Sequence, residues 1–382
     1  MNKRIATAAL SALIASCAYS APFMAVGTSS EIFVTADVSL SFNDNITLGN
    51  DFIAPGATVP FNEVRDDIVF RFAPGVSYEF GRNALMSGKL AYVENISIYQ
   101  DNSDLDAALS DVTFDAKHDD GSSVTSVAAS FRQLNQNTVD VRLPGLSRRD
   151  EIRANVNHEM DLSAKSSIMF GFAWHDTDYS RANLTDRNVT TLPLRYFWEA
   201  TPKVDLSFGG SYRRTDTEFA ASSSDDILLN IGARGDFTPK LKGFVRVGLV
   251  DRSSDDGVDR ASFGMSSNLT YLYSEKTSIN FGVGNDFGSS GVGENQENFD
   301  VFLGFRSEIA ADFALRGRVA YREIDYFSRG ADEFIDGTLG AEYTVNEYLQ
   351  IHGTFNYRTN DGDLATGDFD NTVFSIMAKL RY

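Results

Sequence analysis

The sequence predicts an all-β protein, a transmembrane antiparallel up-and-down β-barrel of about 18 strands, with roughly 16 strands as the alternative. Three observations lead to this fold class. Apolar and polar residues alternate along most of the chain, short and long connections follow one another, and the chain opens with a secretory leader. The mean hydropathy of −0.22 is typical of a soluble protein. Barrel strands, however, are apolar only at every second position, so this average hides them.

The first residues have the three parts of a secretory signal. Lys3 and Arg4 form a positive region, residues 5–15 form a short apolar core, and small residues at 18–20 precede a cleavage site. The core is too short to anchor the chain, and no later stretch reaches the roughly 18 uninterrupted apolar residues of a membrane helix. We therefore expect 1–20 to be removed as a signal peptide.

A lipoprotein signal is the alternative, because residues 14–17 resemble a relaxed lipobox in which Cys17 becomes the first, lipidated residue. With ordinary cleavage the remaining chain has no cysteine, which excludes a disulfide scaffold and a cysteine metal site. After the signal peptide we expect a periplasmic segment over 21–30 and the barrel over 31–382.

Alternation with a period of two marks the strands. It is clear in 298–306, where Phe299, Val301, Leu303 and Phe305 share one face and oppose Asn298, Asp300 and Arg306 on the other. A soluble β-sandwich also alternates. Here, however, the apolar runs of about 9–11 residues have the length that a tilted strand needs to cross a bilayer, and the pattern continues without a domain break.

The connections are sorted by length. Short turns fall at 81–85, 119–122, 161–166, 199–203, 237–240, 274–277, 309–312 and 344–348, and long polar loops lie between them, at 43–65, 100–111, 135–147, 177–187, 216–225, 251–260, 288–297, 326–332 and 359–371. Short periplasmic turns and longer outer loops are the asymmetry of an outer-membrane barrel.

Equivalent turns recur every 35–38 residues, which corresponds to one hairpin plus one outer loop. About nine such periods fit into the chain and give roughly 18 strands. The count falls to roughly 16 if the least regular pair of segments, 108–118 and 122–134, does not form a hairpin.

Polar positions of the strands face the lumen once the apolar positions face lipid. The candidates that line the lumen are Arg71, Arg195, Arg246, Arg306, Arg316, Arg318, Arg322, Asp336 and Glu342. Four of these arginines fall on two adjacent strands, and the two acids on the strand that follows. A basic ladder beside acids would orient charged or dipolar solutes in the pore. The alternative is that these charges pair with each other and stiffen the wall.

The net charge of −19 argues against a nucleic-acid partner, because phosphate binding needs clustered Lys and Arg. Acidic residues gather in the outer loops, for example Asp255, Asp256 and Asp259. The expected partners there are outer-membrane lipid and lipopolysaccharide. No segment has the spacing of an EF-hand calcium loop, and we expect no metal and no cofactor.

No sequence motif predicts an enzyme. The four histidines are spread along the chain, and HExxH, GxSxG and glycine-rich phosphate loops are absent from the sequence. The segment Trp174-His175-Asp176-Thr177-Asp178 falls at the outer end of a strand, where outer-membrane proteases of the omptin type carry Asp-His and Asp-Asp pairs. Those barrels are smaller, and no second carboxylate pair completes the site. A rim hydrolase is therefore a third alternative.

The last predicted strand ends on an aromatic residue. Phe374, Ile376, Leu380 and Tyr382 share its apolar face. An amphipathic strand that ends in this way resembles the C-terminal signal recognised by the barrel assembly machinery, which makes that machinery an expected partner.

Several short motifs resemble the family described as "putative beta-barrel porin 2". The resemblance rests on the opening strand and Asp-Asn loop of residues 34–46, on the Thr-Pro-Lys turns at 201–203 and 238–240, and on Tyr-Arg pairs such as Tyr321-Arg322. It implies a porin-like barrel, and some members of this family accompany exopolysaccharide or capsule export systems. It implies no catalytic residues.

Two main functions are compatible with these observations. The first is a porin-like barrel in the cell outer membrane that lets small polar solutes or a polysaccharide pass through a charged lumen. The second is a closed structural or adhesive barrel whose acidic outer loops meet partners. This second function predicts a lumen filled by side chains or by an inward-folded loop such as 43–65.

Overall fold

The computed structural model describes residues 22–50, 63–136, 146–218, 223–328, 330–363 and 367–382. The predicted signal peptide and the alternative lipidation site at Cys17 lie outside the described residues. In the described part of the chain no helix is long and apolar enough to span a membrane. A short 3-10 turn, η1, lies at Ser103–Leu105.

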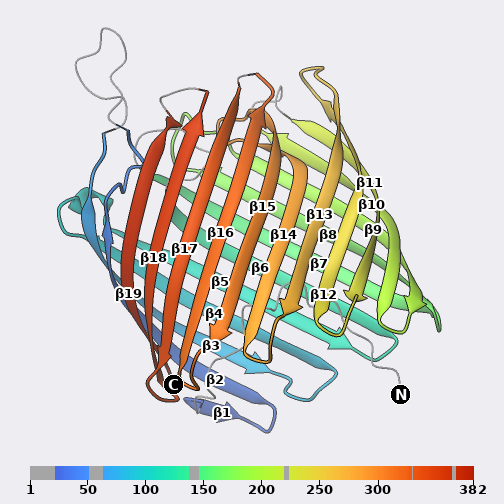
Figure 1. Ribbon diagram of the computed structural model, residues 1–382, viewed down its shortest axis with the longest axis horizontal. Helices are drawn as coiled ribbons and strands as arrows, with labels where there is room; N and C mark the ends of the chain where they lie inside the picture. The colour runs from blue at the N-terminus through green and yellow to red at the C-terminus, as the bar shows by residue number, and fades with distance from the viewer. Residues whose placement is uncertain (1–21, 51–62, 137–145, 219–222, 329, 364–366) are drawn as a thin grey trace.

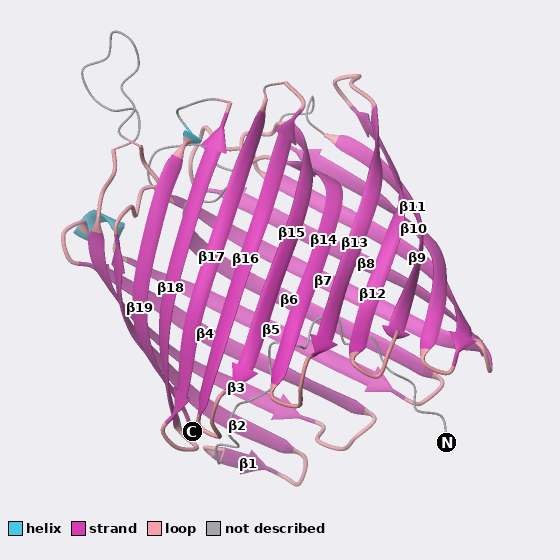
Figure 2. Cartoon of the chain, viewed as in Figure 1, coloured by secondary structure: helices cyan, strands magenta, loops and turns pink. Residues whose placement is uncertain are grey.

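Eighteen antiparallel strands of the described residues form one closed wall (Figures 1 and 2). They are β2 Ser30–Asn43, β3 Asp67–Phe80, β4 Met86–Tyr99, β5 Ala107–Asp119, β6 Ser123–Gln136, β7 Ser147–Ser163, β8 Ser166–Tyr179, β9 Arg187–Thr201, β10 Val204–Thr217, β11 Ser224–Asp236, β12 Leu241–Ser254, β13 Arg260–Leu272, β14 Thr277–Ser289, β15 Asn295–Glu308, β16 Phe313–Tyr326, β17 Ala331–Thr344, β18 Leu349–Gly362 and β19 Phe369–Arg381.

Each strand of this wall pairs with its neighbours in sequence, as an up-and-down barrel requires. The predicted fold class and the count of 18 strands are confirmed. The alternative of 16 strands is wrong, because the segments with the least regular pattern form β5 and β6, which pair with each other. Their alternation is weak because small residues such as Ala129 stand at outward positions, yet the backbone ladder forms regardless of side-chain size.

The seam between β19 and β2 closes the wall. Their ladder extends from Val373 to Arg381 of β19. Tyr382 continues it, because the Val34 N–H donates to the Tyr382 carbonyl oxygen at 2.7 Å and the Tyr382 N–H donates to the Val34 carbonyl oxygen at 2.9 Å. Pairing at this seam removes the free edges of the first and last strands of the wall, so their backbone groups find partners within the wall, as a lipid environment requires.

A further short strand, β1 (Met24–Val26), pairs with the beginning of β2 beyond the end of β19. It lies at the same end of the barrel as the C terminus (Figure 1). The Phe23 ring lies 6.1 Å from the Tyr382 ring, and Tyr348 contacts Tyr382 from the neighbouring turn at 5.4 Å. Part of the segment expected at 21–30 is thus ordered against the wall.

The predicted assembly signal lies on the outward face of β19 and at the residue that follows it. Phe374, Ile376, Leu380 and Tyr382 are all exposed on this face. Their recognition by the assembly machinery stays a prediction.

The connections are sorted to the two ends of the barrel. Short turns lie at the end that carries the C terminus, and the longer loops lie at the other, outer end (Figure 2). Apart from the first, which lies between β2 and β3, the outer loops are shorter than predicted, because the strands continue beyond the apolar belt. β18, for example, extends to Gly362, where a loop was expected from 359. Above the belt both faces of a strand meet water, so the alternation fades while the hydrogen-bonded ladder continues.

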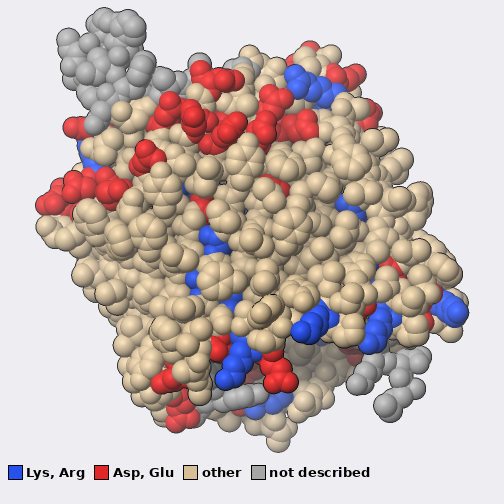
Figure 3. All heavy atoms as spheres, in the orientation of Figure 1, with Lys and Arg blue, Asp and Glu red and all other residues tan. Residues whose placement is uncertain are grey.

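The outward faces carry an apolar belt. On β17, Ile335, Leu339 and Tyr343 are exposed toward the surroundings of the barrel, and Glu333 follows above them. Acidic side chains gather along the edge formed by the outer strand ends (Figure 3). The position of this apolar belt between charged edges is that of an outer-membrane barrel.

The turn between β5 and β6 shows how a short turn is built from its sequence. Gly121 adopts a φ of 84°, a conformation that a residue with a Cβ atom adopts rarely. The backbone N–H groups of Ser123 and Ser122, together with both serine hydroxyls, donate to the Asp120 carboxylate and hold its pKa well below the usual range. This stabilisation is present above the ordinary pKa of aspartate and is lost as the pH falls through the depressed folded-state value.

The assignment of faces predicts a difference between two neighbouring residues. Leu339 lies in the middle of the outward belt of β17, so Leu339→Arg should lower the free energy of unfolding by about 2–4 kcal/mol. Thr338 faces the lumen and donates a hydrogen bond to Asn356. Thr338→Arg is the matched control and should cost about 1 kcal/mol or less. Urea unfolding in lipid vesicles, followed by tryptophan fluorescence, measures both values; equal costs would contradict the assignment.

Candidate functional site in the lumen

The predicted lumen residues lie on the inner face of the wall. On β16, Val319 faces outward with 50% of its surface exposed, and the alternating positions Arg316, Arg318 and Arg322 face inward. Strand pairing and the same alternation place the other candidates on the inner face too, namely Arg71, Arg195, Arg246, Arg306, Asp336 and Glu342. Their part in transport stays a prediction.

Glu342 joins two of the predicted arginines. Arg306 of β15 forms an ion pair with it, and Nη1 of Arg316 lies 3.2 Å from its Oε1. Two of these side chains remain partly exposed, Arg306 by 32% and Arg316 by 40%. Water therefore reaches this part of the wall, and these pairs contribute little to stability.

The remaining candidates of this region also have partners on neighbouring strands. Nε of Arg322 lies 2.5 Å from Oδ1 of Asp300, and Asp336 accepts a hydrogen bond from Nε of Arg358 at 3.1 Å. Most of the basic ladder is thus paired with acids. Arg318 differs, because its guanidinium lies over the Phe302 ring at 4.0 Å and forms no ion pair within the described residues.

The first outer loop folds into the mouth of the barrel. Ile46 is buried in a cluster with Val69 and Tyr99, which stand on the inner faces of β3 and β4. Leu48 packs against a second buried cluster that contains Ile324 and Phe334 of β16 and β17. Residues 44–50 therefore extend along the inside of the wall at its outer end.

Side-chain hydrogen bonds fix the shape of this loop segment. Asn45 donates to the carbonyl oxygens of Gly49 at 2.7 Å and Asp370 at 2.8 Å, and its Oδ1 accepts from the Gly49 N–H. Thr47 donates to the Glu63 carbonyl oxygen at 2.6 Å. The part of the predicted inward loop 43–65 that spans 51–62 lies outside the described residues.

A second inward element is the outer end of the hairpin β14–β15, residues 286–297. The ladder between β13 and β14 ends at Met265 opposite Asn285, so the described residues 260–264 of β13 have no partner on β14. The ladder between β14 and β15 continues to Ser289 opposite Asn295. The hairpin therefore leaves the wall on the β13 side and leans into the lumen.

The contacts of the inward hairpin show that it lies inside the wall. Phe287 has an outward position in the alternation of β14, but only 3% of its surface is exposed. Its ring contacts Phe327 at 5.7 Å and the guanidinium of Arg252 on β12 at 5.1 Å. Behind the hairpin, Arg260 of β13 reaches over the Phe327 ring at 3.9 Å. Arg260 of β13 and Phe327, which follows β16, thus bridge the gap that the hairpin leaves in the wall.

A buried ion-pair network anchors the inward hairpin to strands β10, β11 and β12. Arg252, with 1% of its side chain exposed, donates to both carboxylate oxygens of Asp226 at 2.6 and 2.8 Å and to the Gly288 carbonyl oxygen at 2.7 Å. Arg213 of β10 binds Asp226 and also Asp286 of the hairpin, the latter at 2.7 and 3.0 Å. Two arginines therefore hold both a wall carboxylate and the hairpin.

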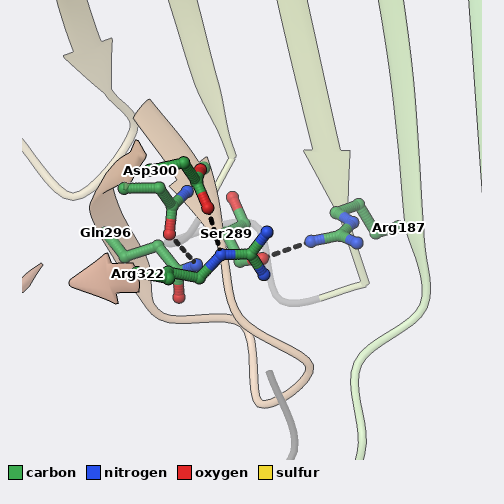
Figure 4. Close-up of a pocket in the computed structure, with 7 residues that line it drawn as sticks. Arg187, Ser289, Gln296, Asp300 and Arg322 are labelled. Atoms are coloured by element: carbon green, nitrogen blue, oxygen red, sulfur yellow. Dashed lines mark hydrogen bonds and ion pairs between the residues drawn. The ribbon is translucent and has the colours of Figure 1, made fainter. Parts of the chain in front are cut away.

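The hairpin also meets the loop between β8 and β9. The Thr185 N–H donates to the Gly291 carbonyl oxygen at 2.9 Å, and Nη1 of Arg187 donates to the Ser289 carbonyl oxygen. A cavity of about 200 Å³ lies beside this contact. In Figure 4, Arg187 at the start of β9 faces the hairpin across it. Its lining residues are Arg187, Gly288, Ser289, Gln296, Asn298, Asp300 and Arg322.

The residues of the alternative rim hydrolase do not converge. His175 faces the lumen, where its Nε2 lies 3.8 Å from Oε2 of Glu151 and 3.3 Å from the Thr177 hydroxyl. Asp176 and Asp178 lie at the alternate positions of β8 and face outward. In the described residues no group of three or more His, Cys, Asp and Glu side chains is arranged to hold a metal ion.

The sequence analysis missed the anchoring residues of the hairpin. Arg213, Arg252, Asp226 and Asp286 all stand at inward positions of clearly alternating strands. Arg213 of β10 and Arg252 of β12 both lie directly opposite Asp226 of β11, which a register drawn from the turn positions could have shown. The contact from β10 to β14 depends on the bend of the hairpin and has no local signal.

Comparisons with known proteins agree with this architecture. The model of the family described as "Putative beta-barrel porin 2" matches residues 103–382. Among solved structures, the outer-membrane protein OpdK from Pseudomonas aeruginosa is similar, with a TM-score of 0.50 and 11% identity over 92% of this chain and 99% of OpdK. OccAB4 from Acinetobacter baumannii has a TM-score of 0.48 and 10% identity over 93% and 99% of the two chains. At such identities the likeness to these structures concerns the fold alone. No curated protein matches the sequence.

The buried network predicts an unequal cost for two arginine substitutions. Arg252→Ala leaves Asp226 buried with one partner fewer and should lower the free energy of unfolding by about 3–5 kcal/mol. Arg322→Ala removes an ion pair whose two side chains are 42% and 41% exposed, and should change it by less than about 1 kcal/mol. Urea unfolding in vesicles compares the two variants; a small cost for Arg252→Ala would refute the anchoring role.

Proposed function

This chain belongs to the "Putative beta-barrel porin 2" family, as its motifs predicted, and from that premise we propose that it lets small polar solutes cross the outer membrane through its charged lumen. The coarse description, a porin-like barrel of the outer membrane, follows from the family and from the fold. The size of the solutes and the route that they take are our proposal.

The observation that carries the proposal is a water-exposed, charged inner face within a wall that is apolar outside. Inward-facing arginines on several strands keep much of their side chain exposed: 47% for Arg132, 56% for Arg153 and 42% for Arg322. Barrels of about 16–18 strands enclose an aqueous channel rather than a core of packed side chains. A charged solute in this lumen can replace part of its hydration shell by contacts with wall side chains. It can pass along the lumen without any rearrangement of the strands.

The two inward elements favour small solutes over a polymer. Residues 44–50 and the hairpin end 286–297 both occupy the outer part of the lumen. For a polysaccharide to pass, we propose that both would have to move aside. The hairpin contact network, with the fully buried Arg252, opposes such a movement.

A closed structural barrel is the second candidate, and the same inward elements favour it. In that case the hairpin and the first loop would seal the mouth, and the acidic outer edge (Figure 3) would be the functional surface. The relatives are porins rather than enzymes, and we propose no catalytic role for His175 or for its neighbours.

Conductance separates the open pore from the closed barrel. We expect the refolded protein without its leader, in a planar bilayer, to carry a steady single-channel current that rises with salt concentration. Folding is checked first by heat-modifiable migration on a denaturing gel. A folded barrel without current would refute the pore and favour the closed barrel.

The hairpin anchor predicts a change in that current. Asp286→Asn removes the ion pair with Arg213 of β10 but leaves Arg213 its second partner, Asp226. The hairpin should then leave its inward position more often, so that conductance or its fluctuations increase. Asp300→Asn is the matched control, since it makes the same charge change on the same hairpin but pairs only with Arg322 on the adjacent strand. Equal currents in both variants would exclude gating by this anchor.

A further inference from the structure

Two inward arginines in the periplasmic half of the lumen have no acidic partner. Arg195 of β9 and Arg246 of β12 form no ion pair within the described residues, and the Nε atom of each is buried without a hydrogen-bond partner. The contact seen for Arg246 is with the ring of Phe244 on its own strand, at 4.3 Å. An unpaired, partly buried guanidinium is costly unless an anion or water satisfies it.

The wall between the two arginines is made of small and polar residues. Arg195 lies opposite Gly209 of β10, and Arg246 lies opposite Gly232 of β11. A Cβ atom on Gly232 would lie only 2.6 Å from Cγ of Arg246, so the arginine side chain lies against this glycine. Ser207 and Asn230 stand beside the glycines on the same face. These residues form a floor on which both arginines can lie.

The geometry brings the two cationic groups together over that floor. Three strand spacings, about 14 Å, separate the backbones of β9 and β12, and the charges of Arg246, Arg234 and Glu159 all act on Arg195. Asn230 is 95% buried, and its Oδ1 atom has no hydrogen-bond partner. The orientation of an asparagine amide depends on its partners, so this side chain can present N–H donors to the same place.

The acids in this region are already bound by a third arginine. Arg234 of β11 donates to both oxygens of Glu159, at 2.9 and 2.5 Å, and to Asp205 at 3.0 Å. Its guanidinium also lies 3.4 Å from the centre of the Phe197 ring. Arg234 thereby pairs with these carboxylates. Glu159 acts on Arg195 through its charge but forms no ion pair with it, so neither Arg195 nor Arg246 has an ion-pair partner of its own within the described residues.

We propose that Arg195 and Arg246 form an anion-binding site on the lumen wall for an oxyanion group, a carboxylate or a phosphate. Guanidinium groups recognise such planar or tetrahedral oxyanions through paired N–H donors, and two of them with a nearby amide suit a group with several oxygens. The inference deepens the proposed function, since it rests on solute passage and names the chemical class of the solute.

The test compares two double variants with the same change in charge. Arg195→Gln/Arg246→Gln removes the site. Arg132→Gln/Arg358→Gln removes two inward arginines that pair with Asp111 and Asp336. The readouts are the block of chloride current by acetate or inorganic phosphate in a planar bilayer, and the midpoint of thermal unfolding in vesicles with and without each anion at equal ionic strength.

For the wild type we expect phosphate or acetate to block the current and to raise the unfolding midpoint. Arg195→Gln/Arg246→Gln should weaken the block by about tenfold or more, as expected when charge-assisted hydrogen bonds are lost, and should abolish the thermal shift. The control should keep both. Block by acetate and phosphate alike indicates a general oxyanion site, and block by phosphate alone a phosphate site.

Equal loss in the two double variants, or no effect of either anion on the wild type, would overturn the anion site. A wild type that carries no current but gains thermal stability from the anion would refute the pore and support the site. The two proposals can therefore fail separately.

Discussion

Closure of the hydrogen-bonded ladder between β19 and β2 is the constraint on which the rest of the structure depends. Lipid offers no hydrogen-bond partner to a free strand edge, so the first and last strands must pair along their edges. Only in the closed wall do the side chains have a lipid-facing side and a water-facing side. Once the wall is closed, the position of a residue along its strand decides whether it faces lipid or water. Arginines such as Arg153 are then tolerated in the middle of a membrane protein, because they stand on the wet face.

Much of this architecture could be predicted because its causes are local. Alternation and the turn repeat predicted 18 strands, and they assigned Arg195, Arg246 and Arg318 to the inner face. The loop lengths were overestimated, because strand ends such as that of β18 are polar on both faces and carry no periodic signal. An ion pair directly across two strands, such as Arg213 with Asp226, could have been found from the register, but one that depends on a bend could not. Whether an inward arginine finds an acid depends on register and on distant bends, as the contact of Arg213 with Asp286 illustrates.

The contacts that stabilise the outer end of this barrel also narrow it, which opposes the passage of solutes that we propose. The inward hairpin gains its position from a buried Arg252–Asp226 pair, and the first loop gains its position from apolar contacts of Ile46 and Leu48. Deeper in the lumen, by contrast, the wall offers exposed ion pairs and two arginines without acids. On the function that we propose, the outer part of the lumen would restrict what enters, and the inner part would bind what has entered.

Because the wall is built from repeated hairpins, it can be enlarged by one hairpin at a time. Each period carries two complete strands and ends in a turn whose hydrogen bonds come from its own residues, as in the turn at Asp120. Duplication of one period would therefore add a pair of strands with matched directions, and the seam would still join two antiparallel neighbours. The circumference of such a barrel can change in evolution by whole hairpins, each step widening the bore without an intermediate that exposes an unpaired edge to lipid.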